Sequence, residues 1–225
     1  MAETNSSTSY SPYKPILLPA LITLAVTLLR LAGELMHWSP QWFNPAPGGG
    51  GAVVGIVWLV PVFGVYFALR LTGSGQGPAR PARAIGYALL GSAILVGGFL
   101  LFQKYIQNLS GLVLMWTLAT LGALIQRAAW RPLFRVLLAY AYLARVPVAV
   151  IMLLATRLRW DSHYSALAMP ETELNWLAQF FLFGFVPQLV WWVGFTVVAG
   201  TLFGSIAAAI ALRRKAISLT APHSQ

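Results

Sequence analysis

Residues 15–37 read PILLPALITLAVTLLRLAGELMH, an apolar run interrupted by polar side chains at helical spacing. As a helix, this run is long enough to cross a hydrocarbon core of about 30 Å. Arg30, Glu34 and His37 stand at i, i+4 and i+7, so they share one helix face, and two threonines precede them on it. A charge at bilayer depth costs roughly 2.5 kcal/mol or more unless it is paired or hydrated. This polar face is therefore a candidate site.

The rest of the chain is as apolar as this run. Of its 225 residues, 58% are hydrophobic and 9% are charged, whereas about 25% of the residues of an ordinary soluble domain are charged. The composition therefore excludes an ordinary soluble domain. The chain has no cysteine, which excludes disulfides, thiolate metal sites and a cysteine nucleophile. We predict an all-α, polytopic membrane protein whose residues 1–225 form a single transmembrane domain in a lipid bilayer.

Six apolar segments are long enough to cross a membrane. They cover residues 15–36, 52–71, 84–103, 110–129, 133–156 and 186–212. Residues 174–212 are too long for one upright helix, and Gly184 and Pro187 divide them, because the residue before a proline resists helical geometry. We therefore predict an extra interfacial helix at 173–184 before the sixth span. Two short re-entrant segments are the alternative.

Basic residues indicate the orientation of these spans. The net charge is +10, and the basic residues gather after every second span. They are Arg70, Arg80 and Arg83, then Arg127, Arg131 and Arg135, then Arg213, Arg214 and Lys215. By the positive-inside bias, both termini are cytoplasmic, with flexible tails at 1–14 and 214–225. The charge therefore indicates topology in a bacterial inner membrane, and we expect no nucleic-acid partner.

Arg145 is the charge closest to the middle of the membrane, about 15 Å beyond Arg135 along the same predicted helix. A buried guanidinium needs a carboxylate or several carbonyls. Glu34 is the predicted partner, and Tyr142 offers a phenolic group one turn away. Arg145 is either a polar staple that joins the first and fifth spans or part of a ligand site. Arg30, near a helix end, either belongs to the same site or extends to the interface.

The outward segment 157–175 adds Asp161, His163, Glu171 and Glu173 to these polar groups. Together with Arg30, Glu34, His37 and Arg145, it predicts an outward-facing polar vestibule. The preceding outward loop, 37–51, is either an interfacial loop with aromatic anchors or a lid over the vestibule. No catalytic or phosphate-binding motif is present, so we predict no catalytic residue, metal or cofactor.

Gly200, Gly204 and Ala208 repeat at spacing four in the last span. Such a face of small residues lets another helix approach closely. Its partner is either a helix of the same chain or a second subunit, in a homo-oligomer or a larger membrane complex.

The run RPLFRVLLAYAYLARVPVAVIMLL at 131–154 is followed by a polar outer segment and a last span that begins near Pro187 and ends in small residues. In this last third to half, the chain resembles bacterial Yip1-type membrane proteins. The resemblance implies a polytopic protein related to trafficking or membrane organisation, with no catalytic residues to carry over. Arg145 stands where that family is usually apolar. The polar face of residues 15–37 and the tetraglycine of 48–51 are also not expected from it.

Three functions are compatible with these features. The first is binding or passage of a small ligand, ion or lipid through the vestibule. The second is a non-catalytic structural subunit or scaffold of a membrane complex. The third is a membrane-embedded enzyme that acts on lipid with the carboxylates and the histidine of 157–175.

Overall fold

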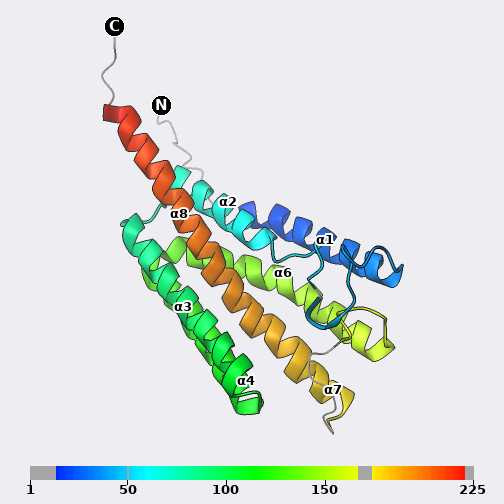
Figure 1. The fold of residues 1–225 in the computed structure, drawn as a ribbon. Helices are drawn as coiled ribbons and strands as arrows, with labels where there is room; N and C mark the ends of the chain where they lie inside the picture. The colour runs from blue at the N-terminus through cyan, green and yellow to red at the C-terminus, as the bar shows by residue number, and fades with distance from the viewer. Residues whose placement is uncertain (1–13, 50, 167–173, 221–225) are drawn as a thin grey trace, which may run out of the picture.

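The computed structural model describes residues 14–49, 51–166 and 174–220. These residues form helices and turns and contain no strand, so the all-α prediction is confirmed for them (Figure 1). Five helices are long and apolar enough to cross a membrane, namely Leu17–Leu35, Pro81–Tyr105, Leu109–Ala129, Arg131–Leu158 and Trp176–Ser218. They indicate a membrane location.

The elements are α1 (Leu17–Leu35), α2 (Leu59–Gly73), α3 (Pro81–Tyr105), α4 (Leu109–Leu124), α5 (Gln126–Ala129), α6 (Arg131–Leu158), α7 (Trp176–Gln179) and α8 (Trp192–Thr220). Local residues explain several of the ends. Pro81 starts α3 in the first turn, where its missing N–H is not needed. The side chain of Asn108 caps α4 by accepting from the Gly111 N–H at 3.0 Å. α6 ends at Arg159, which adopts a left-handed conformation.

The predicted span at 52–71 is wrong in its first part, because α2 begins only at Leu59. In a helix that began at residue 52, the ring of Pro61 would clash with the carbonyl of Val57. With the observed start, Pro61 lies in the first turn, where proline is tolerated. α2 has 15 residues, or about 22 Å at 1.5 Å per residue, which is short for a bilayer core.

The predicted break between an interfacial helix at 173–184 and a span at 186–212 is also wrong. α7 continues into α8 through two π-helical segments, Phe180–Phe185 and Pro187–Trp191. The wider π turn accommodates Pro187 without ending the helix. The helix also continues to Thr220, so residues 214–220 are helical rather than part of a flexible tail.

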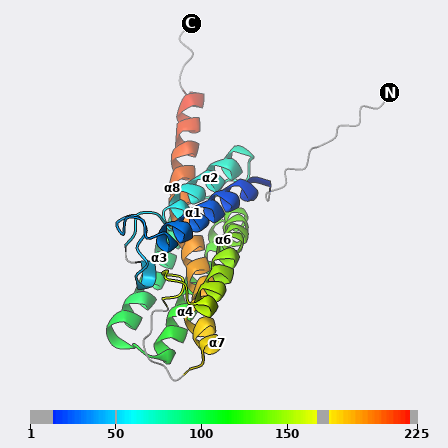
Figure 2. The same ribbon diagram turned by 90° about the vertical axis from the view of Figure 1, so that its right-hand side faces the viewer.

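α8 runs through the middle of the molecule and packs against α2, α3, α4 and α6, while α1 lies against α6 (Figures 1 and 2). Small residues allow the closest approach. A Cβ on Gly64 of α2 would lie 2.6 Å from the Gly200 carbonyl oxygen, and one on Gly204 would lie 2.7 Å from the Gly64 carbonyl oxygen. Ala208 is fully buried. The small-residue face of 200–208 is thus used for helix packing inside the chain.

Candidate functional site

The polar face of α1 points into the protein. Thr23, Thr27, Arg30 and Glu34 are all buried. The Thr23 hydroxyl donates to the Pro19 carbonyl at 2.8 Å, so it accepts from the Tyr140 hydroxyl of α6, also at 2.8 Å. The N-terminal half of this face therefore anchors α1 to α6 through neutral groups, and the charged groups lie in its C-terminal half.

Glu34 is the centre of the charged half. Its Oε1 accepts from the Arg30 Nε–H at 2.8 Å, and its Oε2 accepts from the His163 backbone N–H at 3.0 Å. The His163 Nδ1 lies 2.6 Å from Oε1 and 2.8 Å from Oε2. Because both facing atoms are carboxylate oxygens, the neutral imidazole carries its proton on Nδ1. Glu34 thus holds the segment after α6 against α1.

Arg30 extends the same contact to the loop after α1. Its Nη2 donates to the Gly49 carbonyl at 2.9 Å and to the Asn44 carbonyl at 3.3 Å. Gly49 has a φ of 83°, and a Cβ there would lie 2.7 Å from Nη2, so only glycine fits. We call Arg30, Glu34, His163, Asn44 and Gly49 the outer junction. It joins α1 to two loops far apart in the sequence.

Burial shifts the pKa of two side chains of the segment after α6, His163 and Tyr164. Burial lowers the pKa of His163, and the charge of Arg30 lowers it further, against the raising effect of Glu34. Burial raises the pKa of Tyr164 far above its usual range. Its hydroxyl donates to the Thr27 carbonyl at 3.3 Å.

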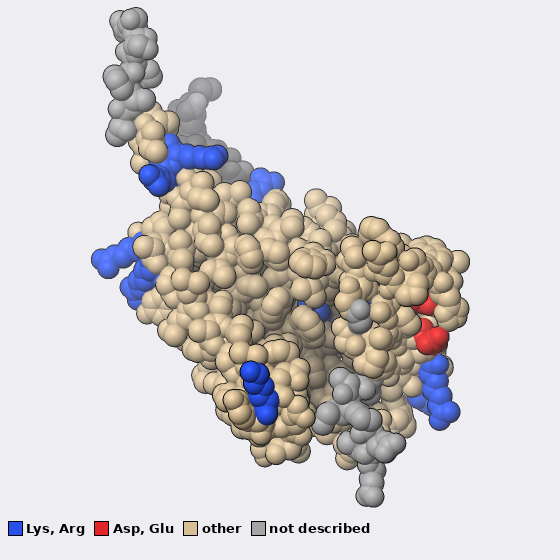
Figure 3. Space-filling view, viewed as in Figure 1, with Lys and Arg blue, Asp and Glu red and all other residues tan. Residues whose placement is uncertain are grey.

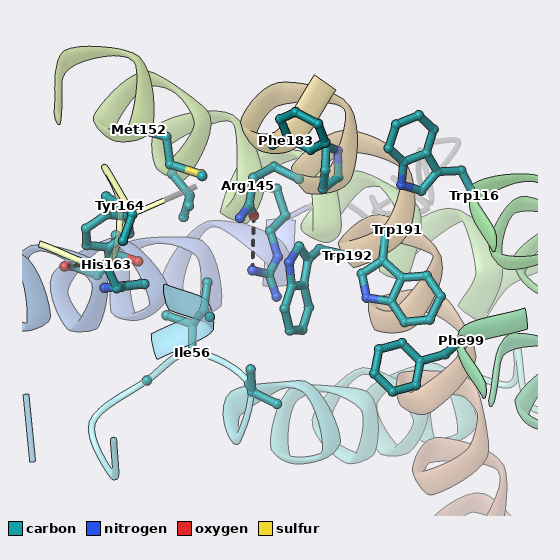
Figure 4. A pocket seen from close by; sticks show the side chains of 18 of the residues that line it. Ile56, Phe99, Trp116, Arg145, Met152, His163, Tyr164, Phe183, Trp191 and Trp192 are labelled. Carbon is teal, nitrogen blue, oxygen red and sulfur yellow. Dashed lines mark hydrogen bonds between the residues drawn. The ribbon is translucent and has the colours of Figure 1, made fainter. Parts of the chain in front are cut away.

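Arg145 lies inside the bundle and is 4% exposed. Its Nη1 donates to Gln188 Oε1 at 3.3 Å, and its guanidinium carbon lies 4.6 Å from the ring centre of Trp192 (Figure 4). The predicted partners are wrong. Glu34 pairs with Arg30 and His163 instead, and Tyr142 is 43% exposed on the outside of α6. The π-helical segment, which periodicity did not predict, carries Gln188 to Arg145.

No carboxylate of the described residues pairs with Arg145. Three of the five acidic residues, Glu3, Glu171 and Glu173, lie outside the described part of the chain. The other two are Glu34, in the outer junction, and Asp161, whose nearest basic partner is His37 at 3.8 Å. Within the described part, the guanidinium therefore has a neutral hydrogen bond and an aromatic ring in place of a counter-charge.

Arg145 borders a cavity of about 350 Å³ between the helices. Figure 3 shows this face hollowed between α3 and α4 on one side and the outer ends of α1 and α6 on the other, with basic atoms on its floor. Arg30, His163 and Tyr164 line one end of the cavity, and Phe99, Trp116 and Trp191 line the other. In Figure 4, Arg145 lies between these two ends.

His37 and Asp161 are not among the described residues that line the cavity. The side chains of His37 and Asp161 are 72% and 75% exposed at the rim of the molecule. Glu171 and Glu173 lie outside the described residues. Gln188 and Trp192 were missed, although a glutamine within a long apolar run is itself a signal of a polar interior. Among the described residues, no group of His, Cys, Asp or Glu is arranged to hold a metal.

Comparisons with protein-family models, with curated proteins and with solved structures find no match for this chain. The chemistry of the site therefore has to be inferred from its geometry.

Proposed function

We propose that this chain is a multi-pass protein of a bacterial inner membrane that binds a small amphiphilic molecule or lipid in its interhelical cavity. One observation carries the proposal. A buried guanidinium, Arg145, faces a cavity of about 350 Å³ and has no counter-charge among the described residues. Such a volume lies in the range of small-molecule sites, about 300–1,000 Å³. An ionisable side chain inside the membrane is a functional-site candidate, and this one has no counter-charge among the described residues.

Loop charge supports an orientation with both termini cytoplasmic. Nine of the fifteen basic residues lie in or beside the connection from α2 to α3, the connection from α4 to α6 and the C-terminal part of α8, and the loop after α1 carries none. By the positive-inside bias, the former face the cytoplasm. In this orientation the chain crosses six times, with α2 and residues 52–58 together forming the second crossing. The cavity then opens in the outer half of the membrane.

The packing supports binding rather than passage. Between the cavity and the cytoplasmic ends of the helices lies the main hydrophobic core, which includes Phe67, Leu71, Leu133 and Leu137. These side chains are fully buried, and a core packed in this way leaves no continuous aqueous path. The scaffold alternative relied on the small-residue face of the last span as a subunit interface. Gly200 and Gly204 of this face pack inside the chain, so the packing does not support that alternative.

A cavity-filling variant tests the proposal. Met115 of α4 lines the cavity and is buried, whereas Val113 is on the same helix and faces outward. In Met115→Trp, the indole should occupy the cavity and abolish the lipid that co-purifies with the wild-type protein. Val113→Trp should leave it unchanged. Native mass spectrometry of the proteins released from mild detergent measures bound lipid directly.

Equal amounts of bound lipid on wild type, Met115→Trp and Val113→Trp would contradict binding in this cavity. An absence of bound lipid from all three, even after incubation with total membrane lipid, would contradict the proposed function itself.

A further inference from the structure

The cavity is polar at one end and apolar at the other. His163, Tyr164 and Arg30 form the polar end, and Phe99, Trp116 and Trp191 form the apolar end. Figure 4 shows Arg145 between them, with Trp192 against its guanidinium. A ligand that fills this space meets a cation in the middle and aromatic rings beyond it. These walls match a molecule with one charged group and an apolar chain.

Arg145 determines the sign of that charged group. A guanidinium offers five N–H donors in a planar fork, which matches the two oxygens of a carboxylate or a phosphate. One of these donors is used by Gln188, and Trp192 covers one face of the fork. The described residues supply no carboxylate to the others. A buried charge without a counter-charge is costly, so an anionic ligand gains most at this position.

The cavity also has a side that faces the bilayer. α2 and α3 pack on different sides of α8 (Figure 1), and α2 is too short to cover the outer part of the space between them. The cavity wall there consists of Ile56 and Val57 from the segment before α2 and of Phe99 from α3. Val57 and Phe99 are each 38% exposed. In the proposed orientation, an apolar chain can therefore enter from the lipid.

We infer that the ligand is a single-chain anionic amphiphile. Its carboxylate or phosphate binds the Arg145 guanidinium, and its chain lies along Phe99, Trp116 and Trp191. This inference rests on the proposed function and gives the bound molecule a chemical class. The volume of about 350 Å³ is near the lower end for ligand sites and therefore suits one chain rather than two.

Tryptophan fluorescence tests the inference, because Trp116, Trp191 and Trp192 line the cavity and bromine atoms on an acyl chain quench a nearby indole. The protein is placed in phosphatidylcholine nanodiscs and titrated with three probes. These are dibromostearic acid, its uncharged methyl ester, and a lysophosphatidic acid with the same brominated chain. The acid and the phosphate should quench saturably at low mole fraction, and unbrominated stearic acid should compete.

The methyl ester should bind at least about tenfold more weakly, since it lacks the charge that Arg145 recognises. The charged probe that binds more tightly identifies the source of the ligand. Tighter binding of the carboxylate indicates a free fatty acid, and tighter binding of the phosphate indicates a phospholipid-derived molecule. Equal saturable quenching by the ester would overturn the anionic class and leave the proposed function standing. An absence of saturable quenching by all three would overturn both.

Variants assign the effect to Arg145. Arg145→Met should remove the preference for the charged probes, so that their affinity falls by about tenfold or more. Arg83→Gln, at an exposed position on α3, should keep this preference. Arg145→Met should also raise the melting temperature of the ligand-free protein, because it removes an unpaired buried charge. A fall in that temperature would identify Arg145 as a structural staple and overturn the inference. If Arg145→Met does not fold, Arg145→Gln provides the same comparison, because it also removes the charge and keeps an N–H donor for Gln188.

Discussion

The buried carboxylate of Glu34 holds three hydrogen bonds from two residues, Arg30 and His163. Loss of its charge leaves the guanidinium of Arg30 unpaired in the protein interior. We expect Glu34→Gln to lower the free energy of unfolding by about 3 kcal/mol, as for other broken buried ion pairs. Denaturant unfolding in detergent, followed by circular dichroism, measures the change.

Asp161→Asn is the matched control for Glu34→Gln. It also removes an acidic charge, but its side chain is 75% exposed, so the change should stay within about 0.5 kcal/mol. Similar losses in both variants would show that the outer junction does not stabilise the fold.

His163 makes stability depend on pH. Burial lowers its pKa below the ordinary value of 6.5, so the unfolded chain takes up a proton first as the pH falls. The unfolding free energy should therefore be highest above about pH 7 and decline from there towards pH 5.5, by at most about 1.4 kcal/mol per pH unit. Melting temperatures measured across this window test the sign.

His163→Gln should flatten this part of the profile, whereas His37→Gln, with a side chain that is 72% exposed in the wild type, should leave it unchanged. A stability that rises on acidification to pH 5.5 in the wild type would contradict a lowered pKa of His163.

The helices themselves were largely predictable, because hydrophobic runs between basic loops carry the signal. The predicted spans at 84–103, 110–129 and 133–156 lie inside α3, α4 with α5, and α6, and their ends differ by three residues at most. The start of α2 and the continuous helix through Pro187 were not predictable in this way. Pro61 lies in the first turn of α2, whereas Pro187 lies inside a continuous helix. The second case depends on π turns that local sequence does not reveal.

The contact between α2 and α8 depends on glycine. In Gly64→Leu the new side chain would collide with the backbone of Gly200, 2.6 Å from the position of its Cβ. We expect a loss of about 2 kcal/mol or more in unfolding free energy, because backbone cannot move aside as a flexible side chain can. Thermal and denaturant unfolding of the purified variant measure this loss.

Gly97→Leu is the control within a helix of the same bundle. No atom lies within 4 Å of a Cβ at Gly97, and the replacement of a helical glycine favours the helix. This variant should be as stable as the wild type or slightly more stable. Equal effects of Gly64→Leu and Gly97→Leu would contradict the close packing of α2 on α8.

At the scale of the whole molecule, the apolar segments could be predicted from the sequence, but most contacts between distant side chains could not. Arg30 and Glu34 are one turn apart, and their pairing follows from helix geometry. His163 is 129 positions from Glu34 along the chain, and no local pattern links them. No local pattern predicts the partner of Arg145 either. Glu34 was expected to pair with Arg145 because it is the only acidic residue near a span, but Arg30 and His163 bind Glu34 instead.

The proposed orientation predicts which loops a membrane-impermeant maleimide reaches. The chain has no cysteine, so single cysteines can be introduced without a prior replacement. Ser39→Cys and Gln107→Cys, exposed in the loops after α1 and α3, should react in intact spheroplasts. Ala79→Cys, exposed in the loop after α2, should react only after permeabilisation. The reverse pattern would place both termini outside.

The central claim is that Arg145 holds an anionic ligand in a cavity that opens to the lipid. An experimental structure determined by electron microscopy in nanodiscs that contain stearic acid tests it most directly. We predict elongated density that begins at hydrogen-bond distance from the Arg145 guanidinium, about 2.7–3.0 Å, and continues past Trp191, and that is absent from Arg145→Met. A cavity that holds only water, with a protein carboxylate bonded to Arg145, would contradict the claim.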